Sequence, residues 1–108
     1  MITGKYPNLR LRRNRKESWS RRLIQENTLS PSDFILPIFL IDGSNKRESI
    51  ATMPDVYRYS VNRLSQIVDN AIKKGIPMVA LFPKIKKNLK NEIGSESLNE
   101  DNLVCKGI

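Results

Sequence analysis

Two short apolar runs constrain the fold of this chain more than any other feature. The first spans residues 34–41 (F-I-L-P-I-F-L-I) and the second spans residues 78–82 (M-V-A-L-F). Both are continuously apolar instead of alternating, which is typical of strands buried on both faces, as in a parallel sheet. Pro37 removes one backbone donor, so we expect it near the start of its strand or at an irregularity.

The segment between these runs has the pattern of an amphipathic helix. Ser60 is expected to cap its start, Gly75 to take a left-handed conformation at its end, and Pro77 to block its continuation. Its apolar residues follow one stripe of a 3.6-residue period: Val61, Leu64, Ile67, Val68, Ala71 and Ile72. The order strand, helix, strand predicts parallel βα units with right-handed crossovers. Two such strands cannot cover their own faces and edges, so this architecture requires more strands than the chain of 108 residues supplies.

The segment before the first apolar run is polar. Residues 1–16 show no sustained periodicity and predict an extended arm, whereas residues 18–27 predict a short helix. Ser30 and Pro31 are expected to begin a capped helical turn.

The other segments surround or follow the second run. Residues 43–59 are turn-rich, with a short extended piece expected around Ile50, and residues 84–97 are expected to form a lysine-rich loop. A last helix is predicted from Asn99, because Asn caps helices well and acidic residues follow it. Little more than two turns fit between Asn99 and Ile108, so we expect an interrupted helix and a chain that is part of a longer protein.

The positive charge is concentrated at the start of the chain. Residues 1–22 hold eight Lys or Arg against Glu17 alone, which places +7 of the net charge of +8 there. This basic arm has three interpretations: binding to nucleic acid through phosphates, contact with a neighbouring subunit whose carboxylates pair with the arginines, or a solvated tail. No recognition motif accompanies the arm, so its composition leaves all three open.

The residue content excludes several kinds of site within the chain. There is no histidine, which removes Ser-His catalysis and imidazole-ligated metals, and Cys105 is the only cysteine, which favours a reducing compartment such as the cytoplasm. No apolar run approaches the roughly 20 residues that span a membrane.

The lysines of the loop are Lys84, Lys86, Lys87 and Lys90. They could bind phosphate or form a Schiff base, but four neighbouring ammonium groups favour a solvated loop. Asp42-Gly43 favours a turn over a catalytic carboxylate. No catalytic, metal-binding or cofactor-binding residue is therefore predicted.

Six colinear segments resemble the N-terminal third of the delta-aminolevulinic acid dehydratase (porphobilinogen synthase) family, and its bacterial branch in particular. They are R-x-R-R-N-R-K at 10–16, W-S-R-R-L-I-x-E-N at 19–27, L-S-P-S-D-F-I-L-P-I-F-L-I-D-G at 29–43, S-I-A-T-M-P-D-V-Y-R-Y-S at 49–60, G-I-P-M-V-A-L-F-P at 75–83 and G-S-E-S-L-N-E-D-N-L-V-C-K at 94–106. There are departures: the chain has Pro54-Asp55-Val56 where the family has Pro-Gly-Val. Gly107 replaces the family's usual Ala, which weakens a helix there by about 0.5–1 kcal/mol.

The resemblance implies an α/β fold that forms the N-terminal third of a (β/α)8 TIM barrel, preceded by an extended basic arm. Residues 1–28 would be the arm and short helix, and residues 29–108 the first two βα units. In the family the arm wraps a partner subunit within a homo-octamer. We therefore expect oligomer contacts from Arg10, Arg12, Arg13 and Trp19.

The same resemblance implies a lyase that condenses two molecules of 5-aminolevulinate to porphobilinogen, with loss of two waters, in haem and tetrapyrrole biosynthesis. The family holds its substrates as Schiff bases on two lysines and uses a divalent metal, zinc or magnesium. The resemblance places these lysines and the metal ligands at positions that have no counterparts in this chain. The chain is therefore expected to be inactive alone. Neither a nucleic acid nor a membrane is the expected partner. Two alternatives remain at this point: a stand-alone basic-armed nucleic-acid-binding module, and an inactive relative that docks onto full-length subunits.

Overall fold

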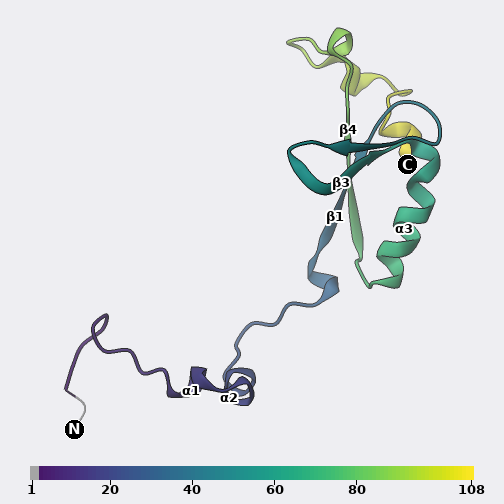
Figure 1. Ribbon diagram of the computed structural model, residues 1–108. Helices are drawn as coiled ribbons and strands as arrows, with labels where there is room; N and C mark the ends of the chain where they lie inside the picture. The colour runs from purple at the N-terminus through teal and green to yellow at the C-terminus, as the bar shows by residue number, and fades with distance from the viewer. Residues whose placement is uncertain (1–2) are drawn as a thin grey trace.

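The apolar run at residues 34–41 forms an inner strand, β1 (Ile35–Leu40), of a four-stranded sheet in the computed structural model, which describes residues 3–108. Strand β4 (Met78–Pro83) lies parallel to β1 along its whole length, from the pair Ile35–Met78 to the pair Leu40–Pro83. Strand β3 (Met53–Tyr59) lies parallel on the other side, and β2 (Arg47–Ile50) pairs antiparallel with β3 at the edge. The strand order is β2-β3-β1-β4, and the sheet is mixed because β2 is antiparallel to its neighbour while the other pairs are parallel. With helix α3 connecting β3 to β4 (Figure 1), the predicted α/β class is confirmed.

Helix α3 (Leu64–Lys73) connects β3 to β4 and packs on one face of the sheet (Figure 1). A 3-10 turn, Val61–Arg63, precedes it, and Gly75 follows in the left-handed conformation (φ +76°), as predicted. The core consists of the buried residues Ile38, Leu40 and Leu64 together with Leu36, Val61, Ile67, Val68, Val79, Leu81 and Leu103. The amphipathic stripe of the helix therefore covers the sheet as its period predicts, although Ile72 at its end stays exposed. Within residues 3–108, no helix has the length and apolarity needed to cross a membrane.

Ser60 precedes the helical segment, but its hydroxyl does not cap it as predicted. The side chain is fully buried, accepts a hydrogen bond from the backbone N–H of Lys46 (2.8 Å), and donates one to Asn62 Oδ1 (2.7 Å). Because Asn62 Oδ1 also accepts from the N–H of Asn45 (2.9 Å), these groups join the loop after β1 to the start of the helix.

The hairpin β2–β3 is the main feature that the sequence pattern missed. Only a short extended piece around Ile50 was expected, yet two paired strands cover residues 47–59. Val56-Tyr57-Arg58-Tyr59 has the β-branched and aromatic content of a strand, but Pro54 and Asp55 begin it with turn-forming residues. Asp55 has a φ of +62°, which explains a glycine at this position in the resembling family.

Replacing Asp55 with Gly is expected to raise the free energy of unfolding by about 0.5–1 kcal/mol, because Gly adopts the left-handed region without the steric cost that an L-residue pays. Urea unfolding followed by circular dichroism measures the change. The matched control is Asp69→Gly within α3, which should lower stability, because Gly is a poorer helix former than Asp. Equal effects of the two substitutions would contradict the explanation from φ.

The helix predicted from Asn99 does not form, so this prediction is wrong. Asn99 is extended, and the described C-terminal segment ends in a 3-10 turn, Cys105–Gly107. Asn102 supplies the cap-like contacts instead, because its Oδ1 accepts from the N–H groups of Val104 and Cys105 (both 2.9 Å). Gly107 lies against the core: a Cβ there would come within 3.1 Å of Leu64 Cδ1. Glycine at this position thus permits the backbone of residue 107 to approach the side chain of Leu64 closely, which helix propensity alone does not predict.

The arm is more ordered locally than predicted. It contains two short helices, α1 (Arg13–Lys16) and α2 (Ser18–Leu23), so residues 13–16 are helical and the expected helix at 18–27 is shorter. Ser20 links the two, because its hydroxyl oxygen lies 2.8 Å from the carbonyl oxygen of Asn14 and 3.0 Å from that of Glu17, and its one proton is donated to these acceptors. Figure 1 shows this arm extending away from the sheet, and the longest dimension of the molecule is 71 Å.

Candidate functional site

Charged side chains gather where the parallel strands end. Asp42 follows β1, Lys84 and Lys86 follow β4, Arg58 lies near the end of β3, and Glu48 lies beside it on β2. Ligands of α/β proteins bind outside the carboxyl ends of parallel strands, because the loops that follow these strands converge there. The C-terminal ends of β1, β3 and β4 and the residues beside them are called the carboxyl edge below. This is the place where the described residues offer a candidate binding site.

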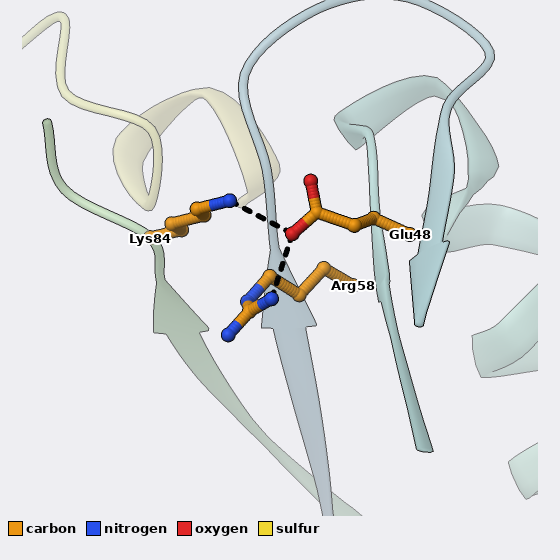
Figure 2. A network of polar contacts seen from close by, with 3 residues as sticks. All are labelled: Glu48, Arg58 and Lys84. Atoms are coloured by element: carbon orange, nitrogen blue, oxygen red, sulfur yellow. Dashed lines mark hydrogen bonds and ion pairs between the residues drawn. The ribbon is translucent and has the colours of Figure 1, made fainter. Parts of the chain in front are cut away.

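Glu48 lies at the centre of a three-residue network. Its Oε1 accepts a hydrogen bond from Arg58 Nη1 (2.7 Å) and another from Lys84 Nζ (2.7 Å), as Figure 2 shows. The hydrogen bond from Lys84, with a further one from Arg58, lowers the pKa of Glu48 below its ordinary value. Glu48 therefore remains a carboxylate at neutral pH, and it holds two cations at the sheet edge.

A second ion pair joins the loops after β1 and β4. Lys86 Nζ lies 2.8 Å from Asp42 Oδ2, and both side chains are largely exposed. The contact lowers the pKa of Asp42 and raises the pKa of Lys86. A Schiff-base lysine requires the opposite shift, because only the neutral amine attacks a carbonyl. The geometry therefore agrees with the interpretation of the lysine-rich loop as solvated.

A small cavity of about 210 Å³ opens beside the ion pair of Asp42 and Lys86. The residues that line it include Glu96, Asp101 and Lys106. Among residues 3–108, no three His, Cys, Asp or Glu side chains converge as metal ligands. The carboxyl edge of the described residues is therefore a surface of mixed charge.

The four residues expected to make oligomer contacts lie on the arm and take no part in this edge. Arg12 and Arg13 are at the start of α1, and the Arg10 guanidinium lies 5.5 Å from the centroid of the Tyr6 ring. Trp19 on α2 is 62% exposed, and Leu23, one turn later, is exposed as well. The arm thus presents an aromatic and an aliphatic side chain among arginines.

Glu48 and Arg58 were missed as candidate residues from the sequence. They oppose each other directly in the register of the hairpin, but Lys84 is 36 positions from Glu48 along the chain. The only available signal was a pair of opposite charges at positions that face each other across two strands, and that signal depends on recognising the hairpin.

The sheet face opposite α3 is apolar and uncovered. Side chains alternate along a strand, so the residues between those of the core point to this face: Ile35, Pro37 and Phe39 on β1, and Met78, Ala80 and Phe82 on β4. The rings of Phe39 and Phe82 lie 5.7 Å apart, and Phe82 is still 51% exposed. Strand β4 is also the outer strand on its side of the sheet.

Comparison with known proteins gives consistent matches. A family model described as delta-aminolevulinic acid dehydratase matches residues 8–108. The protein of that name from Bradyrhizobium diazoefficiens is 50% identical to this chain over 100 residues, and the match covers 93% of this chain and 28% of the relative. The protein of that name from Chlamydia pneumoniae is 40% identical over 99 residues, and the match covers 92% of this chain and 30% of the relative. A crystal structure of the Toxoplasma gondii enzyme with the reaction product porphobilinogen matches with a TM-score of 0.76 at 40% identity, covering 89% of this chain and 27% of that one. The chain therefore spans less than a third of the length of these relatives.

Proposed function

The chain belongs to the delta-aminolevulinic acid dehydratase family, and we propose that it provides the first part of a lyase that condenses two molecules of 5-aminolevulinate to porphobilinogen. The observation that carries this proposal is the match over residues 8–108 to the family, together with the likeness to a structure that contains porphobilinogen. The alternative of a stand-alone nucleic-acid-binding module has no such support, because the family match includes arm and sheet alike.

We propose that the reacting groups lie in the rest of the complete enzyme. Lys86 donates a hydrogen bond to Asp42 and has a raised pKa, and Lys84 donates a hydrogen bond to Glu48. Both arrangements favour a protonated ammonium group over a nucleophilic amine. The divalent metal of the family would likewise take its ligands from elsewhere, since lysine and arginine engage Glu48 and Asp42 and no three potential ligand side chains converge among residues 3–108.

The uncovered sheet face supports the proposal of a TIM barrel. In such barrels the inner side chains of neighbouring strands pack in layers, and each strand has a partner on both sides. The apolar face that includes Phe39 and Phe82, and the outer position of β4, are what the first two βα units would present to the remaining strands. Residues 29–108 would then be these units, and residues 1–28 the arm.

We propose that the arm contacts a partner subunit in a homo-oligomer, an octamer by family resemblance. The support is chemical: exposed Trp19 and Leu23 can bury apolar area, while Arg10, Arg12 and Arg13 can pair with carboxylates of a neighbour. We also place the protein in the cytoplasm, because its single cysteine is exposed and free.

A chimera tests the proposed activity. It joins this chain to the part of the Bradyrhizobium enzyme that follows the matched 28%. We expect it to form porphobilinogen from 5-aminolevulinate, within about tenfold of the intact Bradyrhizobium enzyme, because the scaffold supplied here is 50% identical. A colorimetric assay of the pyrrole product measures the rate. Controls are the 108-residue chain alone and the Bradyrhizobium part alone, both expected to be inactive. A folded chimera without activity would overturn the proposal.

A further inference from the structure

An apolar pocket lies between the loop after β4 and the C-terminal turn. Its volume is about 550 Å³, and the residues that line it include Ile85, Leu89 and Val104. Glu96, which is half-buried, also lines it. No described side chain fills this space, so it can take up apolar side chains from another molecule.

The pocket adjoins the most acidic stretch of the chain, residues 91–105. This acidic stretch holds four acids and no Lys or Arg, whereas residues 1–22 carry a net charge of +7. In the part of the chain that the structure describes, ion pairs engage Asp42 and Glu48 but none of these four acids. The four are Glu92, Glu96, Glu100 and Asp101. The acidic stretch therefore has the charge that pairs with a basic segment, and the arm is the most basic segment of the chain.

One face of α2 on the arm has the complementary chemistry. Trp19, Arg22 and Leu23 lie three and four positions apart, so their side chains share a face of the helix. Trp19 is 62% exposed and Leu23 is 77% exposed. Arg21 differs, because its guanidinium donates to carbonyl groups of residues 15 and 16 within the arm. The shared face thus presents two apolar side chains and one guanidinium group to a partner.

The arm and the acidic stretch of one chain lie at opposite ends of the sheet. The arm enters β1 at its amino end, and the acidic stretch follows β4 at its carboxyl end. Because β1 and β4 are parallel, these two ends point in opposite directions, as Figure 1 shows. The arm extends away from its own pocket, so the matching surface is that of a second copy.

We propose that the pocket of one subunit receives α2 of a second copy, with Trp19 and Leu23 in the apolar space and Arg22 beside Glu96. The inference rests on the proposed homo-oligomer and names the surface that the arm contacts. Apolar burial supplies the affinity, and the opposite charges fix the orientation. Lys90, the one base among the described lining residues, offers the arm no attraction, so its loss does not weaken the contact. The contact is reciprocal, since each subunit gives one arm and receives another.

A charge exchange in the chimera tests the contact, because the chimera contains both the arm and the pocket of this chain. Arg22→Glu and Glu96→Arg are each expected to weaken assembly at least about tenfold, since each places like charges against one another. The double variant should assemble to within about threefold of the unmodified chimera, because the two changes are coupled and restore an opposite pair. Light scattering over a range of concentrations measures assembly, and circular dichroism checks folding.

The matched control is Asp69→Arg, which makes the same change of charge at an exposed position of α3. It should neither weaken assembly nor restore it in the Arg22→Glu variant. If Glu96→Arg does not fold, Glu100→Arg at an exposed position of the acidic stretch takes its place in the exchange.

Unchanged assembly in either single variant, or a double variant that stays dissociated, would overturn the inference. The second result would mean that the later part of the same subunit covers the pocket. A chimera that remains monomeric also overturns it, together with the proposed oligomer. Because the measurement is assembly and not porphobilinogen formation, an inactive chimera that shows the expected rescue contradicts the proposed activity alone.

Discussion

Replacing Trp19 with Ala in the chimera, together with Arg10, Arg12 and Arg13, is expected to weaken subunit assembly by at least about 30-fold. Buried Trp and Arg side chains dominate interface energies, and losses of about 2 kcal/mol or more are usual when such residues are truncated; 2 kcal/mol corresponds to about 30-fold in affinity. Because these side chains are on the exposed arm and outside the sheet core, the folding of each subunit should be preserved. Size-exclusion chromatography with light scattering over a range of concentrations measures the assembly.

A charge-matched control separates assembly from net charge, because the arm variant loses three positive charges. Lys74 lies at the end of α3, and Lys87 and Lys90 lie in the loop after β4; replacing these three exposed residues by Ala removes the same charge from the surface. We expect this control variant to assemble like the unmodified chimera. If both variants dissociate equally, or neither does, the assignment of oligomer contacts to the arm is wrong.

The elements that could be predicted from the sequence are those whose pattern is local and long. Strand β1, helix α3 and strand β4 each bury a continuous run or a regular stripe, so their hydrophobic period identifies them without knowledge of their neighbours. Gly75 similarly predicts the end of a helix, because the left-handed conformation is a property of one residue.

The elements that were missed depend on contacts between distant residues. The hairpin carries charges at Arg47, Glu48 and Arg58, which argue against a buried strand; cross-strand pairing and the register with β1 stabilise it instead. At the C-terminal end, the local capping pattern at Asn99 favours a helix. The backbone instead forms turns and a short 3-10 segment, in which Leu103 packs on the core and Gly107 lies close to Leu64.

The candidate site was harder to predict than the fold for the same reason. Asp42 and the lysines after β4 were recognised as strand-end charges, since they directly follow the apolar runs. Their pairing could not be predicted: Lys86 is 44 positions from Asp42, and Lys84 is 36 positions from Glu48. Which lysine meets which carboxylate is decided by the order of strands in the sheet, and that order includes the hairpin.

The largest difference between the chain alone and the chimera is expected for Phe82→Ala. Phe82 is 51% exposed on the uncovered face of the 108-residue chain, so its truncation there should lower the free energy of unfolding by less than about 1.5 kcal/mol. In a closed barrel the same ring would be buried against the remaining strands, and removing a buried Phe costs about 3–5 kcal/mol. Urea unfolding of both proteins, with and without the substitution, measures the two losses.

Leu64→Ala provides the matched control for this comparison, because Leu64 is already buried between α3 and the sheet. Its truncation should cost about 2–5 kcal/mol in the chain and in the chimera alike. The loss of unfolding free energy caused by Phe82→Ala is then compared between the two proteins. If it is larger in the chimera while the loss caused by Leu64→Ala is the same in both, the newly buried surface lies on the face opposite α3, where a barrel interior would be. Equal Phe82 losses in the two proteins would mean that this face remains in water, and the first two strands would then not be part of a closed barrel.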